Sequence, residues 1–352
     1  MLQSSSKNRL VHIDIMIGIA MILVVLGHFS LGFEPGWYHF GLHNWIYSFH
    51  MQLFLFLSAF LIRYTYKGVH SLKDYGLYIW RKFKKFFLWF ILIGLAIDLM
   101  ACPIKGIPLS ASYLGHSLRT LLLYPRASEA SFLWYIYILF GYYLISPLFF
   151  RLPQWAQTLC CVLALFLPML HGSLFLDTYD FTQYTFFYCL GVLCAEWIDD
   201  IRTAKTWLWA LLSVPFVAFS CWLFGQGQFL GFEHPSLGWW SLVTGTASLP
   251  FFYFLSLALA KSQTVTKILT VISVNCYWIY LFQMFIIWGC ARLVYSSGLV
   301  EGFPFVPFFI ITALLAIAIP IAIAQLFRFF CNKNKDKKAG LPFRAAPPKI
   351  HL

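Results

Sequence analysis

Two histidines stand in apolar parts of the sequence, where an imidazole is costly. His28 lies near the end of the apolar run 11–31, and His50 lies early in the next run, 43–63. An ionisable side chain at membrane depth usually faces an internal cavity or a partner. An imidazole can take the proton of a hydroxyl, which is otherwise a poor nucleophile near neutral pH. Both residues are therefore candidates for proton transfer. The alternative for His28 is a neutral ring hydrogen-bonded to a neighbouring helix.

The spacing of the two histidines places them at a similar depth. At a helical rise of about 1.5 Å per residue, each lies within about 10 Å of the same membrane surface, so adjacent antiparallel helices can bring them side by side. Three interpretations of His50 remain open: it binds the acceptor or orients His28, it forms a hydrogen bond between packed helices, or it ligates a metal. No zinc-like spacing of ligands accompanies it, so we predict no metal site.

A cluster of basic residues precedes the third apolar run and is formed by Arg81, Lys82, Lys84 and Lys85. Basic side chains at the start of a helix can hold phosphates, and the planar fork of Arg81 suits bidentate binding best. The alternative is that the cluster carries only the positive charge typical of cytoplasmic loops. The sequence alone does not separate these two interpretations.

Other polar side chains within apolar runs extend the set of candidates. Asp14 lies one turn inside the first run, where it either faces water and headgroups or contributes to function. Tyr277, Tyr280 and Gln283 are spaced by three residues, so a helix presents them on about one face, where they can line a cavity.

The composition shows which elements must position these residues. Of the 352 residues, 61% are hydrophobic and only 11% are charged, whereas a soluble domain is roughly half apolar and a quarter charged. The sequence therefore predicts an all-α, polytopic membrane helix bundle, because a lipid environment forces backbone hydrogen bonding into helices. The net charge of +12 is explained by cytoplasmic loops and lipid headgroups, and no basic soluble module indicates binding to nucleic acid.

Apolar runs long enough to span the bilayer recur along the whole chain. We expect about ten transmembrane helices, near residues 11–31, 43–63, 82–101, 132–151, 157–173, 183–199, 206–225, 239–260, 268–292 and 306–329. With both termini cytoplasmic, 21 basic residues fall inside and 4 outside, as the positive-inside rule requires. Residues 1–330 are predicted to form one transmembrane domain. Residues 331–352 are predicted to form a basic, disordered cytoplasmic tail.

Several stretches, in order along the chain, resemble the acyltransferase-3 family of integral membrane O-acyltransferases. "HIDIMIGIAMILVVLGHFS" is similar to the family's first span, with an early Asp and a late Gly-His. "FHMQLFLFLSAF" is similar to its second span and includes Ser58. "FLWYIYILFGYYLISPLF" is similar to a later span that begins with Leu-Trp, here Trp134, and "NCYWIYLFQMFII" to a late Tyr-Leu stretch. The basic cluster at Arg81 matches the patch before the family's third span.

The resemblance implies a membrane enzyme that moves an acyl group, usually acetyl from acetyl-CoA, to a hydroxyl of a cell-envelope glycan or a lipid-linked sugar. It implies that His28 is catalytic, that His50 and Asp14 belong to the same machinery, and that Ser58 and Trp134 contribute to the substrate cavity. The alternative, purely structural interpretations are a helix-packing hydrogen bond for Ser58 and an interfacial position for Trp134. The bacterial inner membrane is the family's commonest setting. Acyl-CoA serves as a donor substrate, and no tightly bound cofactor is expected.

The basic cluster of Arg81, Lys82, Lys84 and Lys85, called the donor cluster below, is expected at the inner membrane face. His28 lies about 25 Å from the cytoplasmic end of the first span at helical rise, so the pantetheine arm of CoA would need a passage between helices. The sequence departs from the family pattern at four positions: Ile17 replaces Arg, Gln52 replaces Pro, Ala59 replaces Gly and Gln283 replaces His. Two other functions remain open. One is a proton-coupled transporter, which the lack of an internal repeat disfavours. The other is an inactive scaffold of a polysaccharide assembly system.

Overall fold

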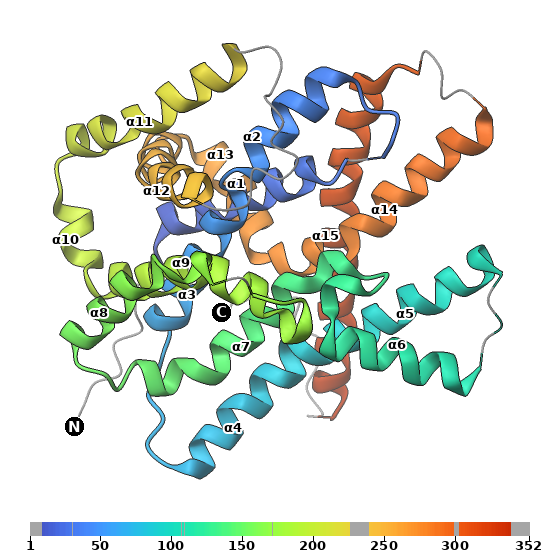
Figure 1. The fold of residues 1–352 in the computed structure, drawn as a ribbon, viewed down its shortest axis with the longest axis horizontal. Coiled ribbons are helices and arrows are strands. Elements are labelled where there is room, and N and C mark those ends of the chain that lie inside the picture. Colours follow the sequence, from blue (N-terminus) through green and yellow to red (C-terminus); the bar gives the residue numbers. More distant parts are fainter. Residues whose placement is uncertain are drawn as a thin grey trace. The chain divides into compact units, whose positions relative to one another are not determined.

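A computed structural model describes residues 9–29, 31–106, 108, 110–170, 172–225, 239–298 and 303–338. These residues form helices and connecting turns, and no strand occurs among them, as the composition predicts (Figure 1). The helices gather into two compact units whose segments alternate along the chain. The first unit comprises Met1–Phe54, Thr206–Pro235 and Ala247–Leu352, and the second comprises Leu55–Lys205 and Ser236–Thr246.

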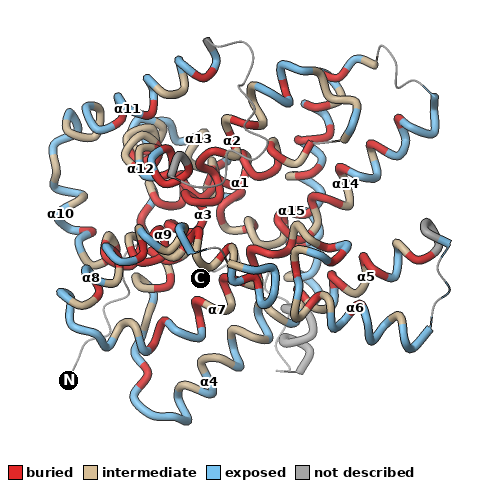
Figure 2. Tube along the Cα trace, viewed as in Figure 1, coloured by how far each residue is buried: buried red, intermediate tan, exposed pale blue. Residues whose placement is uncertain are grey.

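The first unit is built around α1 (Val11–Gly27), which packs against α13, α14 and α15. Figure 2 shows α1 buried along most of its length. Gly18 permits the closest contact, because a Cβ atom there would lie 2.5 Å from the backbone oxygen of Leu269. The other elements of this unit are the π-helix η1 (Trp37–His43), α2 (Asn44–Tyr47), the start of α3 (His50–Tyr64), α11 (Thr206–Gly225), most of α12 (Trp239–Leu259), α13 (Gln263–Val274), α14 (Cys276–Ser297) and α15 (Phe305–Lys338).

The second unit holds the rest of α3 and the helices of the middle of the chain. Gly191 lets α9 approach α3, since a Cβ atom there would lie 2.3 Å from the backbone oxygen of Phe56. Arg63 and Glu196 form an ion pair of 2.8 Å between the same two helices. The elements are α4 (Leu72–Lys82), η2 (Phe83–Phe87), α5 (Leu88–Lys105), α6 (Ala111–Leu123), η3 (Pro125–Ala127), η4 (Ser131–Leu133), α7 (Trp134–Phe149), α8 (Gln154–Ala164), η5 (Leu167–Met169), η6 (Phe175–Asp177), α9 (Thr178–Glu196) and α10 (Ile198–Thr203).

Seven helices of the described part are long and apolar enough to cross a membrane, which agrees with a polytopic membrane bundle. They cover Trp37–Tyr64, Leu72–Cys102, Ser131–Phe149, Thr206–Phe224, Ser241–Leu259, Cys276–Ser297 and Phe305–Phe330. Of the remaining predicted spans, 11–31 and 157–173 correspond to shorter apolar helices, Val11–Gly27 and Gln154–Met169. The predicted span 183–199 falls on α9, which is not among the seven because polar residues occupy its first half.

Three predicted boundaries differ from the structure. The span predicted at 82–101 belongs to a continuous helical segment that begins at Leu72, since the π-helix η2 joins α4 to α5 without a break. The span predicted at 268–292 is two helices, because Asn275 leaves helical geometry (φ −107°, ψ 8°) and separates α13 from α14. Helix α15 continues to Lys338, inside the segment predicted as a disordered tail, and residues 339–352 lie outside the described part.

Candidate active site

His28 is the C-terminal cap of α1 and is held there by a tight helix contact. The preceding residue is Gly27, and a Cβ atom at that position would lie 3.0 Å from the ring of Tyr47 and 3.2 Å from Ile46. The absence of a side chain at Gly27 therefore lets α2 pack directly against the end of α1. His28 is half-buried in the resulting contact, and its backbone N–H donates to the Val25 carbonyl at 3.2 Å.

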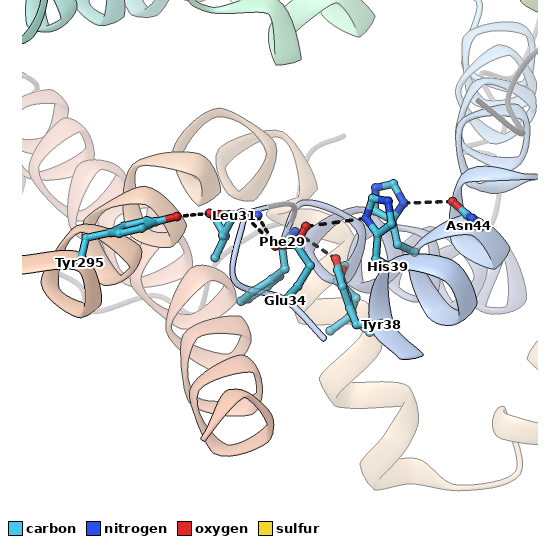
Figure 3. A network of polar contacts seen from close by, with 10 residues as sticks. Phe29, Leu31, Glu34, Tyr38, His39, Asn44 and Tyr295 are labelled. Carbon is cyan, nitrogen blue, oxygen red and sulfur yellow. Dashed lines mark hydrogen bonds and ion pairs between the residues drawn. The ribbon is translucent and has the colours of Figure 1, made fainter. Parts of the chain in front are cut away.

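Tyr38 fixes the backbone on both sides of His28. Its hydroxyl donates to the Leu26 carbonyl at 2.7 Å and accepts from the Phe29 N–H at 3.1 Å (Figure 3). The Tyr38 side chain is fully buried, so these two bonds are shielded from solvent. Leu26 and Phe29 lie on either side of His28 in the sequence. Tyr38 therefore fixes the backbone from which the imidazole extends.

His50 begins α3 and is almost completely buried. Its Nδ1 lies 2.8 Å from the Ile46 carbonyl, which can only accept, so Nδ1 carries the proton. In the neutral ring this tautomer leaves a lone pair on Nε2. The ring also packs against Tyr47 at a centroid distance of 4.7 Å. The two histidines lie close enough for a charge on His28 to repel a charge on His50.

Gln283, on α14, lies beside His28, close enough to influence its charge. It is fully buried, yet neither its amide nitrogen nor its amide oxygen has a hydrogen-bond partner of proper geometry. The same holds for Nδ1 of His28. A buried amide without partners costs about 1–3 kcal/mol and calls for an explanation.

The other two residues of the predicted stripe lie on the same helix. Tyr280 is buried, and Tyr277 is half-buried one turn from it. Both belong to the first unit, as His28 does. The spacing of three residues places Tyr277, Tyr280 and Gln283 along α14, and Gln283 lies beside His28.

Asp14 is not brought to the histidine pair. It lies fourteen residues before His28 on one helix, which separates the two by about 20 Å. Its carboxylate pairs with Arg9 and accepts a 3.4 Å hydrogen bond from the Ser273 hydroxyl on α13. These contacts join the two helices at the opposite end of α1, so the expected catalytic partnership of Asp14 with His28 is not supported by this geometry.

The four basic residues of the donor cluster differ in their surroundings. Lys82 is half-buried, and its ammonium lies 4.2 Å from the ring centroid of Tyr143, with the rings of Tyr78 and Phe86 within 6 Å. The ammonium of Lys84 lies over Trp80, and Lys84, like Arg81 and Lys85, is exposed. The exposed side chains can reach a phosphate, whereas aromatic rings surround Lys82.

Ser58 and Trp134 both take part in contacts within the second unit. The Ser58 hydroxyl bonds to the Tyr135 hydroxyl at 2.5 Å. The Trp134 ring stacks on Tyr184 at 5.3 Å and lies under the Arg126 guanidinium at 4.0 Å, so only 7% of the side chain is exposed. The Trp134 ring is enclosed by these contacts, and the Ser58 side chain is half-buried.

A buried ionic network beside Trp134 is absent from the sequence-based candidates. Arg126 donates two hydrogen bonds of 2.6 Å to Asp180, which is 1% exposed. Asp177 lies next to this pair with a left-handed backbone (φ 53°) and no exposed surface. Burial raises the pKa of Asp177 to about 9, and the neighbouring Asp180 adds to the shift. The sequence offered one signal for this network. Asp177 and Asp180 lie three residues apart before an apolar run, a pattern typical of a helix start.

The described residues contain no group of three or more His, Cys, Asp or Glu side chains arranged to hold a metal ion. The imidazoles of His28 and His50 and the amide of Gln283 can accept and donate protons and hydrogen-bond to an oxygen.

Comparisons with known proteins identify related sequences. The nodulation protein NolL of Sinorhizobium fredii is 25% identical over 224 residues, which are 62% of this chain and 56% of NolL, so the aligned part is little more than half of that relative. No solved structure matches the chain. A family model described as an acyltransferase domain matches residues 10–325 and thus includes the helices that carry His28, His50 and Gln283. The chain belongs to the acyltransferase-3 family.

Proposed function

We propose that this membrane acyltransferase transfers acetyl, or a related short acyl group, from cytoplasmic acyl-CoA to a hydroxyl of a cell-envelope glycan or a lipid-linked saccharide, in the bacterial inner membrane. The observation that carries the proposal is the group of unpartnered polar atoms at one buried place: Nδ1 of His28 and both amide atoms of Gln283, beside His50.

His28 acts as the base in this proposal. The acceptor oxygen bonds to the thioester carbonyl carbon, the carbon–sulfur bond breaks, and the hydroxyl proton passes through the imidazole to the leaving thiolate. His50 supports the step from Nε2, whose lone pair is set by the Nδ1–H bond to Ile46. A hydrogen bond to that lone pair would hold His28 in position and stabilise its protonated form.

Gln283 donates to the oxygen that becomes negative in the tetrahedral intermediate. Three polar side chains are candidates for this role: His50, Ser58 and Gln283. The N–H of His50 donates to Ile46, and the hydroxyl of Ser58 shares a hydrogen bond with Tyr135, whereas the amide nitrogen of Gln283 has no hydrogen-bond partner among the described residues. The amide is also neutral, so it stabilises an oxyanion without competing for the transferred proton.

The exposed members of the donor cluster, Arg81, Lys84 and Lys85, hold the phosphates of CoA in this proposal. Aromatic rings enclose the ammonium of Lys82, the fourth member of the cluster.

The test is acyl transfer by the purified protein in lipid nanodiscs with radiolabelled acetyl-CoA and extracted envelope glycans. We expect His28→Ala to abolish transfer and Gln283→Leu to reduce kcat by about 100-fold, the usual loss for one oxyanion donor. His116→Ala, on α6 of the second unit, serves as the matched histidine control.

Two outcomes contradict the proposal. One is full activity in His28→Ala. The other is a wild-type protein that neither consumes acetyl-CoA nor changes the glycans but moves a solute across liposomes, which would identify a transporter.

A further inference from the structure

The π-helix η1 exposes rings and an imidazole directly after the loop that follows His28. Trp37 is 52% exposed and Phe40 is 49% exposed, and the side chain of His39 between them is 46% exposed. Tyr38 points the other way and is fully buried. We call Trp37, His39 and Phe40, together with Glu34, the loop surface. Short π-helical segments occur often at functional sites.

The residues of the loop surface are held in place before any ligand binds. One carboxylate oxygen of Glu34 accepts the Leu31 N–H at 2.9 Å and the Gly32 N–H at 2.6 Å, and the other lies 3.7 Å from Nδ1 of His39 (Figure 3). The Trp37 ring packs edge-on against Phe305 of α15 at 5.9 Å. Rigid recognition groups lose little entropy on binding.

A column of rings leads from the loop surface to the histidine pair. The His39 ring stacks parallel to His43 at 5.8 Å, His43 stacks on Tyr47 at 4.1 Å, and Tyr47 meets His50 at 4.7 Å. One end of this column is exposed at His39, and the other is buried at His50, which is 2% exposed. The loop surface is therefore connected to the proposed site by continuous packing within one unit.

The length of the helical segment supports a position at the edge of the membrane. Trp37–Tyr64 is continuous over 28 residues, whereas roughly 20 residues cross the hydrocarbon core. The surplus lets the first turns, which include the loop surface, extend into the headgroup region or beyond. Aromatic rings alone would suit lipid contact there. The exposed imidazole of His39, which lies between Trp37 and Phe40 in the sequence, is instead suited to hydroxyl groups.

We propose that the loop surface binds the saccharide portion of the acyl acceptor, which holds the acceptor next to the proposed site. A pyranose has an apolar C–H face that stacks on an indole or phenyl ring, and an edge of hydroxyls that hydrogen-bond to His39. Glu34, whose side chain is only 10% exposed, holds His39 and the preceding loop in place. This inference rests on the proposed function, because it takes the acceptor to be a sugar.

The experiment measures binding of the full-length protein in nanodiscs to an array of defined bacterial oligosaccharides, without acyl-CoA. We expect Trp37→Ala and Phe40→Ala each to weaken binding by about tenfold, the loss of one stacked ring. Trp207→Ala is the control, since Trp207 is also strongly exposed (63%) but lies on α11. Acetyl-CoA consumption without acceptor is measured on the same preparations and is expected to stay unchanged.

The inference is overturned if wild-type protein binds none of the oligosaccharides. It is also overturned if Trp37→Ala and Phe40→Ala bind as wild type does, or if Trp207→Ala weakens binding equally, which would indicate lipid contact. Saccharide binding that depends on Trp37 in a protein that never consumes acetyl-CoA would contradict the proposed enzyme and leave the binding surface established.

Discussion

The guanidinium of Arg126 donates two hydrogen bonds of 2.6 Å to the carboxylate of Asp180, which lies 54 residues later in the sequence. The acid is buried, and the arginine covers one face of Trp134. This pair joins η3 to α9 and stabilises the second unit rather than the histidine site.

Removing one partner of this pair should destabilise the protein strongly. We expect Arg126→Met to lower the free energy of unfolding by about 3 kcal/mol, because the Asp180 charge is left buried and unpaired. Thermal unfolding in detergent measures the change, with the exposed Arg119→Met as control. The double variant Arg126→Met/Asp180→Asn should recover part of the loss. If the single and double variants unfold alike, the pair contributes little.

The pH dependence of stability should report on Asp177. Its pKa in the folded protein is raised from 3.8 to about 9, so the folded state holds this proton more tightly than the unfolded state. That stabilisation is complete below about pH 4 and is lost as the pH rises towards 9. We expect the Tm of Asp177→Asn to fall less than that of wild type between pH 5 and pH 9. Parallel profiles would show that Asp177 ionises normally.

Two substitutions of His50 test the contributions of its two ring nitrogens separately. Asn places a donor near the position of Nδ1 and can keep the bond to Ile46, whereas Gln places a polar group near Nε2. If Nε2 supports His28, His50→Asn should fold normally and lose at least 100-fold in kcat, and His50→Gln should keep more activity. Acyl-transfer rates and Tm are measured together. Equal rates for the two variants would leave His50 with a packing role.

Tyr38 should matter more for catalysis than for stability. Tyr38→Phe removes the bonds to Leu26 and Phe29, which hold the backbone around His28. We expect a loss of about 1 kcal/mol in stability and a fall of about tenfold in kcat with an unchanged KM for acyl-CoA. Tyr137→Phe, which removes a 2.9 Å bond to the Leu122 carbonyl, is the matched control. A similar fall in kcat in the control would make the effect nonspecific.

The exposed members of the donor cluster should affect the KM for acyl-CoA more than Lys82, which aromatic rings enclose. We expect Lys84→Ala/Lys85→Ala to raise the KM for acyl-CoA by about tenfold, since each lost phosphate contact costs of the order of 1 kcal/mol. Lys82→Met should leave that KM within about twofold of wild type, because aromatic rings already surround its ammonium. The reverse ranking in steady-state kinetics would assign donor binding to Lys82.

The sequence predicted the parts of this protein that depend on local pattern. Apolar length predicts the helices, and membrane depth predicts that His28 and His50 meet, because both properties follow from spacing along one chain. The position of Gln283 beside His28 depends on how α14 packs on α1, and the spacing of residues along the sequence does not predict that packing. The break at Asn275 was missed because both sides of it are apolar, so the hydropathy signal continues through it. Pairing of Arg126 with Asp180 depends on the fold of the second unit, which hydropathy does not specify.

The interruption at Asn275 has a mechanical consequence. Before it, α13 is tied to α1 by the close approach of Leu269 to Gly18 and by the bond from Ser273 to Asp14. After it, α14 carries Gln283 to the other end of α1. A small rotation at Asn275 would move the Gln283 amide towards or away from the His28 imidazole. The contacts between α13 and α1 would stay unchanged. The geometry for holding an oxyanion could thus be adjusted without repacking the rest of the unit.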